Sequence, residues 1–500
     1  MKKTFMLVAL ASLCPIFNAA AQVVPPGEPS SLRSLPVEAR LGVENITLPG
    51  SEVMGLVGGS YLLQWSPHWL AGPAVYGAAS GHRGGFFVGG AELAYRAELS
   101  SNWRVEAGLF AGGGGGGAAP VGGGLMLRPH VDVLTRVGQS WGLQGVWAGV
   151  SASSVRFANG NIRSQQAGLV LLLDDQFIYT LPSLAGQQLS TEARGGVGFD
   201  RIQLVVGQDQ PRAGGQGIGL AGFRLDQWLS PHTYWGIEAA GAAHGGADGY
   251  AEVLATLGLD HPIKGTPLSV GARVALGLGG GGAVPTEGGG LAKAGATLSW
   301  QLSRDVFLSL EGGAVTAPQG SFRARYAQAS LGWELDHPGR GVASGAAPSS
   351  AWIDGMTWSL ALEQVQDAAR KDGRRQSLQS VGLQLTRPIN DTWYLSGQAH
   401  SAFGGGAGAY STGLVGLGAQ TPRLAGGWSG AVELLAGAAG GGGVHTQGGA
   451  VVQPMAKLQW RTGTQSRVYI GAGRIRSLSG ELNSPVLELA WGLAFGVPTR

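Results

Sequence analysis

The sequence predicts an all-β fold, a single large antiparallel transmembrane β-barrel of about 24 strands that is built from three related units of about eight strands. Three observations predict it. Apolar and polar residues alternate along most of the chain, as in half-buried strands. Glycine-rich runs recur three times at intervals of about 160 residues. No apolar stretch after the first 21 residues approaches the ~18 residues that a membrane helix needs.

The N-terminal residues have the pattern of a secretory signal peptide, which we place at residues 1–21. Lys2 and Lys3 are followed by an apolar stretch and by small residues that end at Ala21. The only cysteine, Cys14, lies in this segment, so the mature chain is expected to contain neither disulfides nor thiolate metal sites. Residues 22–40 are expected to form a short periplasmic segment before the first barrel unit.

The composition narrows the class of protein. Charged residues make up 13% of the chain, against about 25% in ordinary soluble domains. Glycine contributes 90 of 500 residues, and the formal net charge is only +3. This balance gives no reason to expect a nucleic-acid partner.

The repeat divides the chain into three barrel units, expected at residues 41–180, 190–337 and 351–495. The glycine runs that mark it are Gly112–Gly124, Gly277–Gly290 and Gly437–Ala450. Proline turns precede aromatic strand starts at similar intervals, as in "SPHWLAG" and "SPHTYWG". Because several landmarks keep the same spacing, a chance clustering of glycines does not explain the pattern.

Period-2 alternation assigns the two faces of the strands. In the last segment Leu487, Leu489 and Trp491 alternate with small or polar residues. The same reasoning turns nine charged residues toward the barrel interior: Arg104, Glu106, Arg128, Asp132, Arg273, Lys293, Glu433, Lys457 and Glu488. Tryptophans fall mostly beside short turns, which is the position of an aromatic girdle at a membrane interface.

The chain direction then sorts the connections. With an even number of strands both termini lie on the periplasmic side, and short turns such as "SPH" and "SRD" lie there too. The glycine runs therefore fall on the outer side. They are interpreted either as flexible hairpin loops or as a gate whose bare backbone lines a passage.

The signal peptide, the alternating strands and the final "VLELAWGLAF" (residues 486–495) resemble Gram-negative outer-membrane β-barrel proteins. This resemblance is one of architecture. It implies location in the cell outer membrane and insertion by the barrel-insertion machinery. The closing strand of such proteins ends in an aromatic residue, and here Phe495 is followed by "GVPTR".

Motifs for catalysis and cofactors are weak. "GIGLAG" (residues 217–222) matches a dinucleotide fingerprint, but no helical pattern follows it. No hydrolase, zinc-protease or P-loop signature occurs. We therefore expect no enzyme and no cofactor. His82, His244 and His400 occur once per unit near glycine-rich loops, and we interpret them as solvated loop residues, so no metal site is expected.

Arginine pairs form a second threefold feature, in the outer loop between the last two strands of each unit. The guanidinium group suits phosphate or carboxylate. These candidate anion contacts would meet either lipopolysaccharide phosphates or an anionic exported polymer. They are Arg156, Arg163, Arg323, Arg325, Arg474 and Arg476.

The predicted function is an outer-membrane pore or export conduit for a polysaccharide, a polypeptide or another bulky solute. A barrel of about 24 strands encloses a wide lumen, and the segment before residue 41 is too short to plug it. Expected partners are outer-membrane lipid and lipopolysaccharide, the exported polymer and periplasmic assembly proteins. The alternative is a structural or adhesive surface protein with glycine-rich outer loops. A further possibility is that residues 180–190 and 336–355 link three separate eight-stranded barrels.

Overall fold

The structure is a computed structural model that describes residues 32–138, 145–189, 195, 199–334 and 351–499. The predicted signal peptide, Cys14 and residues 22–31 lie outside the described residues. No helix of the described residues is long and apolar enough to cross a membrane. The described helical segments are three short 3-10 turns: η1 (Pro49–Ser51), η2 (Pro182–Leu184) and η4 (Ala425–Gly427).

The first unit forms one closed antiparallel barrel, here barrel 1. Each strand pairs with the next, and the last pairs back with the first. Its strands are β1 (Arg33–Thr47), β2 (Val53–Gln64), β3 (Trp69–Ser80), β4 (Phe87–Ser100), β5 (Trp103–Gly115), β6 (Met126–Gly138), β7 (Gly145–Phe157) and β8 (Arg163–Tyr179).

The second unit repeats this arrangement as barrel 2. Its strands are β10 (Arg201–Pro211), β11 (Ile218–Trp228), β12 (Thr233–His244), β13 (Ala251–Pro262), β14 (Leu268–Gly280), β15 (Gly290–Gln301), β16 (Val306–Thr316) and β17 (Arg323–Glu334).

The third unit forms barrel 3, in which β18 pairs with both β19 and β25. The two-residue strand β9 (Gln188–Leu189) pairs antiparallel with the first two residues of β18. The strands of barrel 3 are β18 (Ala351–Ala369), β19 (Arg375–Pro388), β20 (Trp393–Gly404), β21 (Ser411–Gln420), β22 (Trp428–Gly440), β23 (Ala450–Arg461), β24 (Ser466–Ser477) and β25 (Asn483–Thr499).

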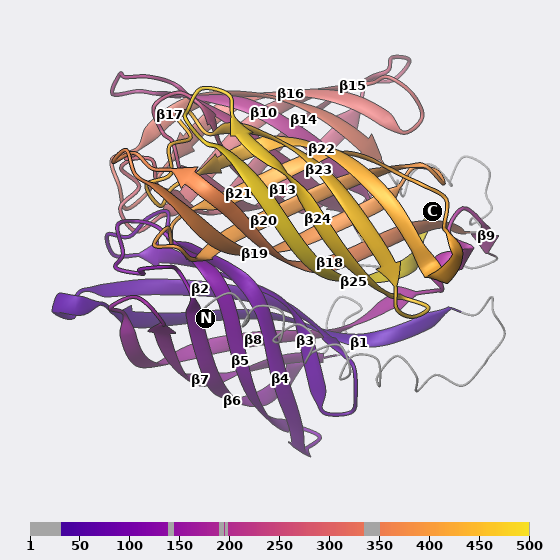
Figure 1. The fold of residues 1–500 in the computed structure, drawn as a ribbon, viewed down its shortest axis with the longest axis horizontal. Helices are drawn as coiled ribbons and strands as arrows, with labels where there is room; N and C mark the ends of the chain where they lie inside the picture. The colour runs from indigo at the N-terminus through magenta and orange to yellow at the C-terminus, as the bar shows by residue number, and fades with distance from the viewer. Residues whose placement is uncertain (1–31, 139–144, 190–194, 196–198, 335–350, 500) are drawn as a thin grey trace.

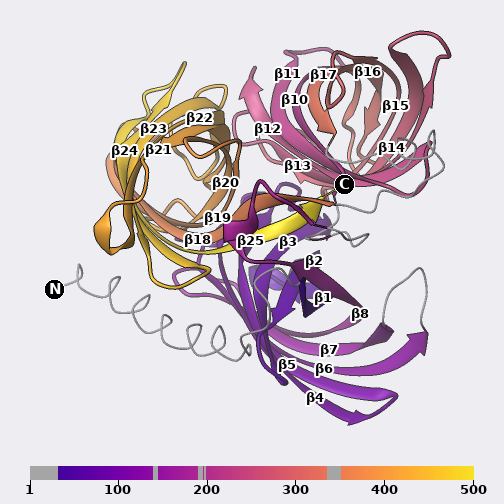
Figure 2. The same ribbon diagram turned by 90° about the vertical axis from the view of Figure 1, so that its right-hand side faces the viewer.

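The all-β class and the three units of eight strands are confirmed, but the closure differs from the single barrel of about 24 strands. Within each unit the first and last strands pair with each other. This pairing consumes the edges that would otherwise have joined one unit to the next. The chain therefore has the three eight-stranded barrels that the sequence left open as a further possibility (Figures 1 and 2).

Strand bounds also differ from the expected unit bounds at both ends. β1 begins at Arg33, so residues 33–40 are strand rather than a separate periplasmic segment. β25 continues past Phe495 to Thr499.

All three barrels have the same polarity. The chain enters and leaves each barrel at the end that carries the short turns, such as Ser66–His68, and we call this the turn end. The glycine runs connect the fifth and sixth strands at the opposite end, the loop end. In Figure 1 the C-terminus and β9 lie at the right, at the turn end.

The strands have a polar inner face and an apolar outer face. In β6, Arg128, His130 and Asp132 are buried inside, whereas Val131 and Val133 are exposed outside. All nine charged residues that alternation assigned to the interior are buried. This inside-out arrangement is the one that a membrane-spanning barrel requires.

If the outer faces of the strands contact lipid, the cost of placing an arginine there depends on its depth in the membrane. Val274 lies near the middle of β14 and is 52% exposed, while Leu259 lies near the turn end of β13 and is 56% exposed. Val274→Arg should cost about 2–4 kcal/mol of unfolding free energy, and Leu259→Arg about 0–1 kcal/mol, because the penalty falls toward the interface. Urea unfolding in lipid vesicles measures both. Equal costs at the two depths would mean that this surface does not face lipid.

The glycine-rich loops join the barrels in a cycle. At each junction the loop after the third strand of one barrel meets the loop after the fifth strand of the next. The Gly84 N–H donates to the Glu287 carbonyl oxygen (2.5 Å), and the Gly408 N–H donates to the Gly122 carbonyl oxygen (3.2 Å). At the remaining junction the Thr446 hydroxyl donates to Asp248 (2.5 Å). The glycine runs are thus packed between barrels. This differs from both interpretations based on the sequence, which were flexible hairpin loops and a gate lining a passage.

Barrels 1 and 3 share a second contact at the turn end. Phe495 is buried there against Phe177, Tyr179 and Trp358, with ring centroids 5.1 Å apart for the Phe177–Phe495 pair. The Thr180 N–H donates to the Gly496 carbonyl oxygen (2.7 Å). The C-terminal aromatic residue therefore packs the closure seam of barrel 3 against that of barrel 1.

Candidate functional site

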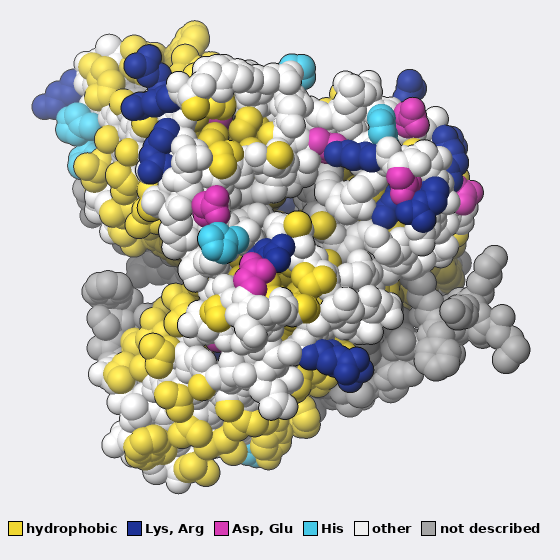
Figure 3. Space-filling view, turned by 90° about the vertical axis from the view of Figure 1, so that its left-hand side faces the viewer, with side chains coloured by type: hydrophobic (Ala, Val, Ile, Leu, Met, Phe, Trp, Pro, Cys, Tyr) yellow, Lys and Arg dark blue, Asp and Glu magenta, His cyan; other side chains and the backbone are white. Residues whose placement is uncertain are grey.

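The predicted arginine pairs lie on the outer surface at the loop end of each barrel. All six side chains project from the hairpins that join the seventh and eighth strands, and all six are exposed. Figure 3 shows this end of the molecule, with Lys and Arg side chains over each barrel and apolar side chains along the flanks. The structure brings the two arginines of each pair close together.

The pairs do not occupy equivalent positions in the three hairpins. In barrel 1, Arg156 lies directly opposite Arg163. The corresponding pair in barrel 2 is Thr316 opposite Arg323, and in barrel 3 it is Arg476 opposite Asn483. Each hairpin thus keeps two arginines while their positions vary. This pattern preserves local positive charge rather than one fixed binding geometry.

Barrel 3 has a groove at this hairpin, with a volume of about 510 Å³. Arg474 and Arg476 line it together with Arg375, which sequence reasoning missed because it begins the distant strand β19. Arg474 donates to the Asn483 side chain (2.5 Å). Arg476 has no ion-pair partner among the described residues. Glu481 also lines the groove, so three guanidinium groups face one carboxylate and leave the groove positively charged, which allows it to bind an anionic group.

The barrel interiors determine whether a passage exists, and they are filled in layers. At the loop end an apolar layer closes each barrel from inside. Phe86, Tyr250 and Tyr410, which follow the loop after the third strand, are fully buried in this layer. Val121, Val284 and Val444 from the glycine-rich loops pack with them.

Below the apolar layer of barrel 2 lies a network of paired charges. The Glu311 carboxylate accepts from Arg273 (2.6 Å), from Arg224 (3.0 Å) and from the Tyr326 hydroxyl. Glu238 pairs with Arg224 at 2.6 Å and with Arg273 at 3.0 Å. Two arginines and two glutamates therefore neutralise one another across the lumen.

Barrel 1 is filled in the same way. Arg128 forms a two-bond contact with Glu44, at 2.9 and 2.8 Å. Arg40 pairs with Glu92 at 2.6 Å and also contacts Asp132. A cavity of about 10 Å³ remains beside Arg40, Glu44 and Arg128, which is about the minimum for one water molecule.

The turn end is closed by aromatic and basic groups in barrel 2. The Arg201 guanidinium lies 4.8 Å from the Trp228 ring centroid and 4.4 Å from that of Phe307. Trp228 lies beside a short turn, where the sequence predicts an aromatic girdle facing the membrane interface, but its side chain is buried inside the barrel. Eight-stranded barrels have interiors just wide enough for side chains, and these interiors follow that rule.

The three histidines do not come together. His82 is exposed and contacts Glu287 of barrel 2 at 2.8 Å, and His244 is exposed at the end of β12. His400 is buried inside barrel 3, so the loop interpretation was wrong for this residue. His400 belongs to β20, which extends to Gly404, whereas the glycine-rich sequence predicts that a loop begins near His400.

Sequence reasoning also missed most partners of the inward charges, including Glu38, Arg40, Glu44, Glu92, Arg96, Arg224, Glu238, Glu252 and Glu311. Period-2 alternation within their strands could have identified these residues as inward-facing. Glycine and alanine occur on both faces of the strands and obscure the alternation.

Comparisons with known proteins add little about function. No family model matches the chain, and no curated protein does. The solved structures that match include Pseudomonas aeruginosa OccK8 (OprE), with 8% identity, 93% of this chain and 98% of that chain covered, and a TM-score of 0.24. P. aeruginosa OpdK with vanillate has 11% identity, coverage of 94% and 100%, and a TM-score of 0.23.

The siderophore receptor PirA from Acinetobacter baumannii has 8% identity, coverage of 94% of this chain and 81% of that chain, and a TM-score of 0.29. By name, OpdK is an outer-membrane protein and PirA is a siderophore receptor.

Proposed function

We propose that the chain is a structural outer-membrane protein that acts through its loop-end surface, where arginines bind anionic groups of the outer leaflet. The filled interior of each barrel is the observation that carries this proposal. In the described part of the chain the outer faces are apolar and side chains fill the barrel interiors, so we infer that the protein acts through its surface. The groove lined by Arg375, Arg474 and Arg476 supplies a basic site there.

Lipopolysaccharide phosphate is the ligand chemistry that fits this site. Arginine binds phosphate through parallel N–H donors, and the hairpins lie at the level where the outward apolar strands end. The tight packing of the three barrels would then fix several arginine hairpins at set positions on the leaflet.

A polymer conduit loses its basis, because it was inferred from one lumen of about 24 strands and the chain has three closed barrels of eight. A pore for small solutes is the second candidate. The charged middle layer of each barrel favours it, since such layers can hold water and ions. Conduction would require the apolar layer around Phe86, Tyr250 and Tyr410 to move aside.

The test replaces Arg156, Arg163, Arg323, Arg325, Arg474 and Arg476 together by Gln. We expect the purified variant to lose salt-sensitive binding of lipopolysaccharide, because exposed charge contacts are screened within about 8 Å at physiological ionic strength. Cells that carry it should become more sensitive to large antibiotics. The control variant, Arg304→Gln with Arg423→Gln, removes exposed arginines at the turn end and should bind like the wild type.

Dephosphorylated lipopolysaccharide distinguishes recognition of phosphate from contact with acyl chains. It should bind weakly to the wild type and to the sixfold variant alike. Unchanged binding by the sixfold variant would contradict the proposal. In planar bilayers the wild type should be silent. Steady conductance would contradict the structural role and support the pore for small solutes.

A further inference from the structure

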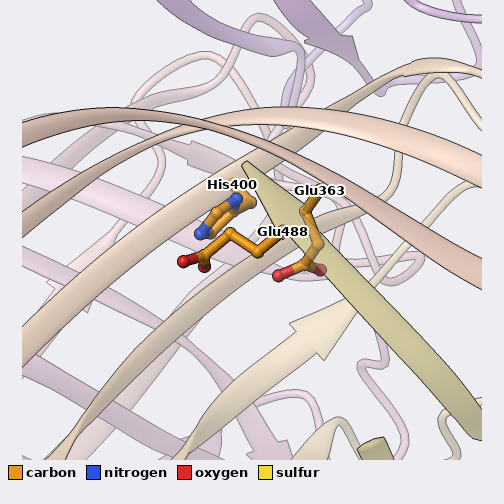
Figure 4. A group of neighbouring side chains, drawn as sticks. All are labelled: Glu363, His400 and Glu488. Atoms are coloured by element: carbon orange, nitrogen blue, oxygen red, sulfur yellow. The ribbon is translucent and has the colours of Figure 1, made fainter. Parts of the chain in front are cut away.

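We propose that barrel 3 contains a binding site for a divalent transition-metal ion, formed by Glu363, His400 and Glu488. Their potential ligand atoms all lie within 4.8 Å of one another, and all three side chains are buried. Figure 4 shows the three side chains lying close to one another. The site is independent of the loop-end surface on which the proposed function rests.

The strand register places two carboxylates side by side. Glu363 on β18 lies directly opposite Glu488 on β25. Like charges directly opposite each other destabilise a sheet, so a cation bound between Glu363 and Glu488 would stabilise this pair. The equivalent positions in the other barrels avoid the conflict, since Glu44 lies opposite Gly168 and Gly207 opposite Gln328.

The charges inside barrel 3 do not balance within the protein. Its buried carboxylates are Glu363, Glu433 and Glu488, and its one buried ammonium group is that of Lys457. Lys457 contacts Glu433 (2.9 Å) and Glu488 (3.0 Å), and Glu363 has no ion pair with a basic residue of the described chain. Buried charges are normally paired or coordinate a metal. A divalent cation beside Glu363 would neutralise the excess.

His400 provides the second, independent observation. It is 2% exposed, and neither ring nitrogen has a hydrogen-bond partner among the described residues. Gly382 lies opposite it on β19, and a Cβ there would approach the imidazole Cγ to 2.5 Å. The barrel thus makes room for an imidazole and leaves its nitrogens free, although burying them unbonded costs free energy.

Further polar atoms near the cluster also have no partner among the described residues. They include Ser380 Oγ on β19, Thr412 Oγ1, which is opposite His400 on β21, and Gln453 Oε1, whose amide nitrogen donates to Glu363 (3.2 Å). These groups could hold the water molecules that complete the coordination sphere.

One imidazole and two carboxylates suit Zn²⁺, which binds nitrogen at about 2.0–2.1 Å and carboxylate oxygen at about 2.0–2.2 Å. Barrel 1 offers a useful contrast. Its buried His130 also lies beside two acidic residues, Glu92 and Asp132, but Arg40 contacts both carboxylates and takes the place of a metal. Only barrel 3 therefore presents a cluster of this type among the described residues.

The experiment uses the full mature chain, refolded in detergent with Zn²⁺ and then freed of excess metal. We expect about one Zn²⁺ per chain and a higher unfolding temperature than in EDTA, because binding to the folded state stabilises it. Co²⁺ in place of Zn²⁺ should show d–d absorption bands. Glu363→Gln keeps the shape and removes the repulsion, so it should fold. Loss of a ligand should lower its affinity for Zn²⁺, and with it the metal content, by about tenfold or more.

His130→Gln is the matched control, since it removes the other histidine that is buried among the described residues and should leave the metal content unchanged. Heat-dependent migration of the compact band on gels shows that each variant is folded. A folded wild type that retains no metal would overturn the proposal, as would equal retention by the wild type and Glu363→Gln.

Discussion

Replacing Gly84, Gly113 and Gly440 together by Ala should lower the unfolding free energy by about 3–9 kcal/mol and loosen the contacts between barrels. Each glycine faces a different junction. A Cβ at Gly113 would overlap the Ser401 carbonyl oxygen, one at Gly440 would lie 2.6 Å from the Gly249 nitrogen, and one at Gly84 would lie 2.6 Å from the Glu287 carbonyl oxygen. Overpacking costs about 1–3 kcal/mol at each site, and distant sites add.

None of these three glycines has a positive φ, so alanine is not strained by the backbone itself. The control variant replaces Gly290, Gly397 and Gly413, which also have ordinary φ values and have no atom within 4 Å of the added Cβ. It should be as stable as the wild type or more stable. Urea unfolding and the temperature at which the compact gel band disappears measure both variants. Equal stability of the two triple variants would show that the junctions contribute nothing.

Glu311→Ala should destabilise barrel 2 by about 3–5 kcal/mol, because it leaves the buried Arg224 and Arg273 with one carboxylate between them. The Tyr326 hydroxyl would also lose its acceptor. Unfolding in urea, followed by tryptophan fluorescence, measures the loss. Glu481→Ala changes an exposed glutamate and should cost little.

A second variant tests whether the loss of stability comes from lost packing or from a buried arginine left without a partner. Arg273→Met with Glu311→Leu removes both partners and fills similar space, so it should recover much of the stability. If the double variant were as unstable as Glu311→Ala, the cost would come from packing rather than from unpaired charge.

The sequence determined which face of each strand is polar. Alternation is a local property, and Arg128, Asp132, Lys293 and Lys457 are inside as it predicts. The repeat also determined the three units of eight strands, because each unit carries its own set of turns and glycine runs. The side of the barrel on which the arginine hairpins lie followed from counting strands.

Tertiary structure alone decided how these strands close. The same alternating pattern fits one wide barrel or three narrow ones, since strands pair through backbone N–H and C=O groups, which are the same whatever the side chain. Closure between β1 and β8, and likewise in the other two units, changed the expected lumen into three filled interiors. It also brought His400 close to Glu363 and Glu488, residues far apart in the chain that only the strand register places together.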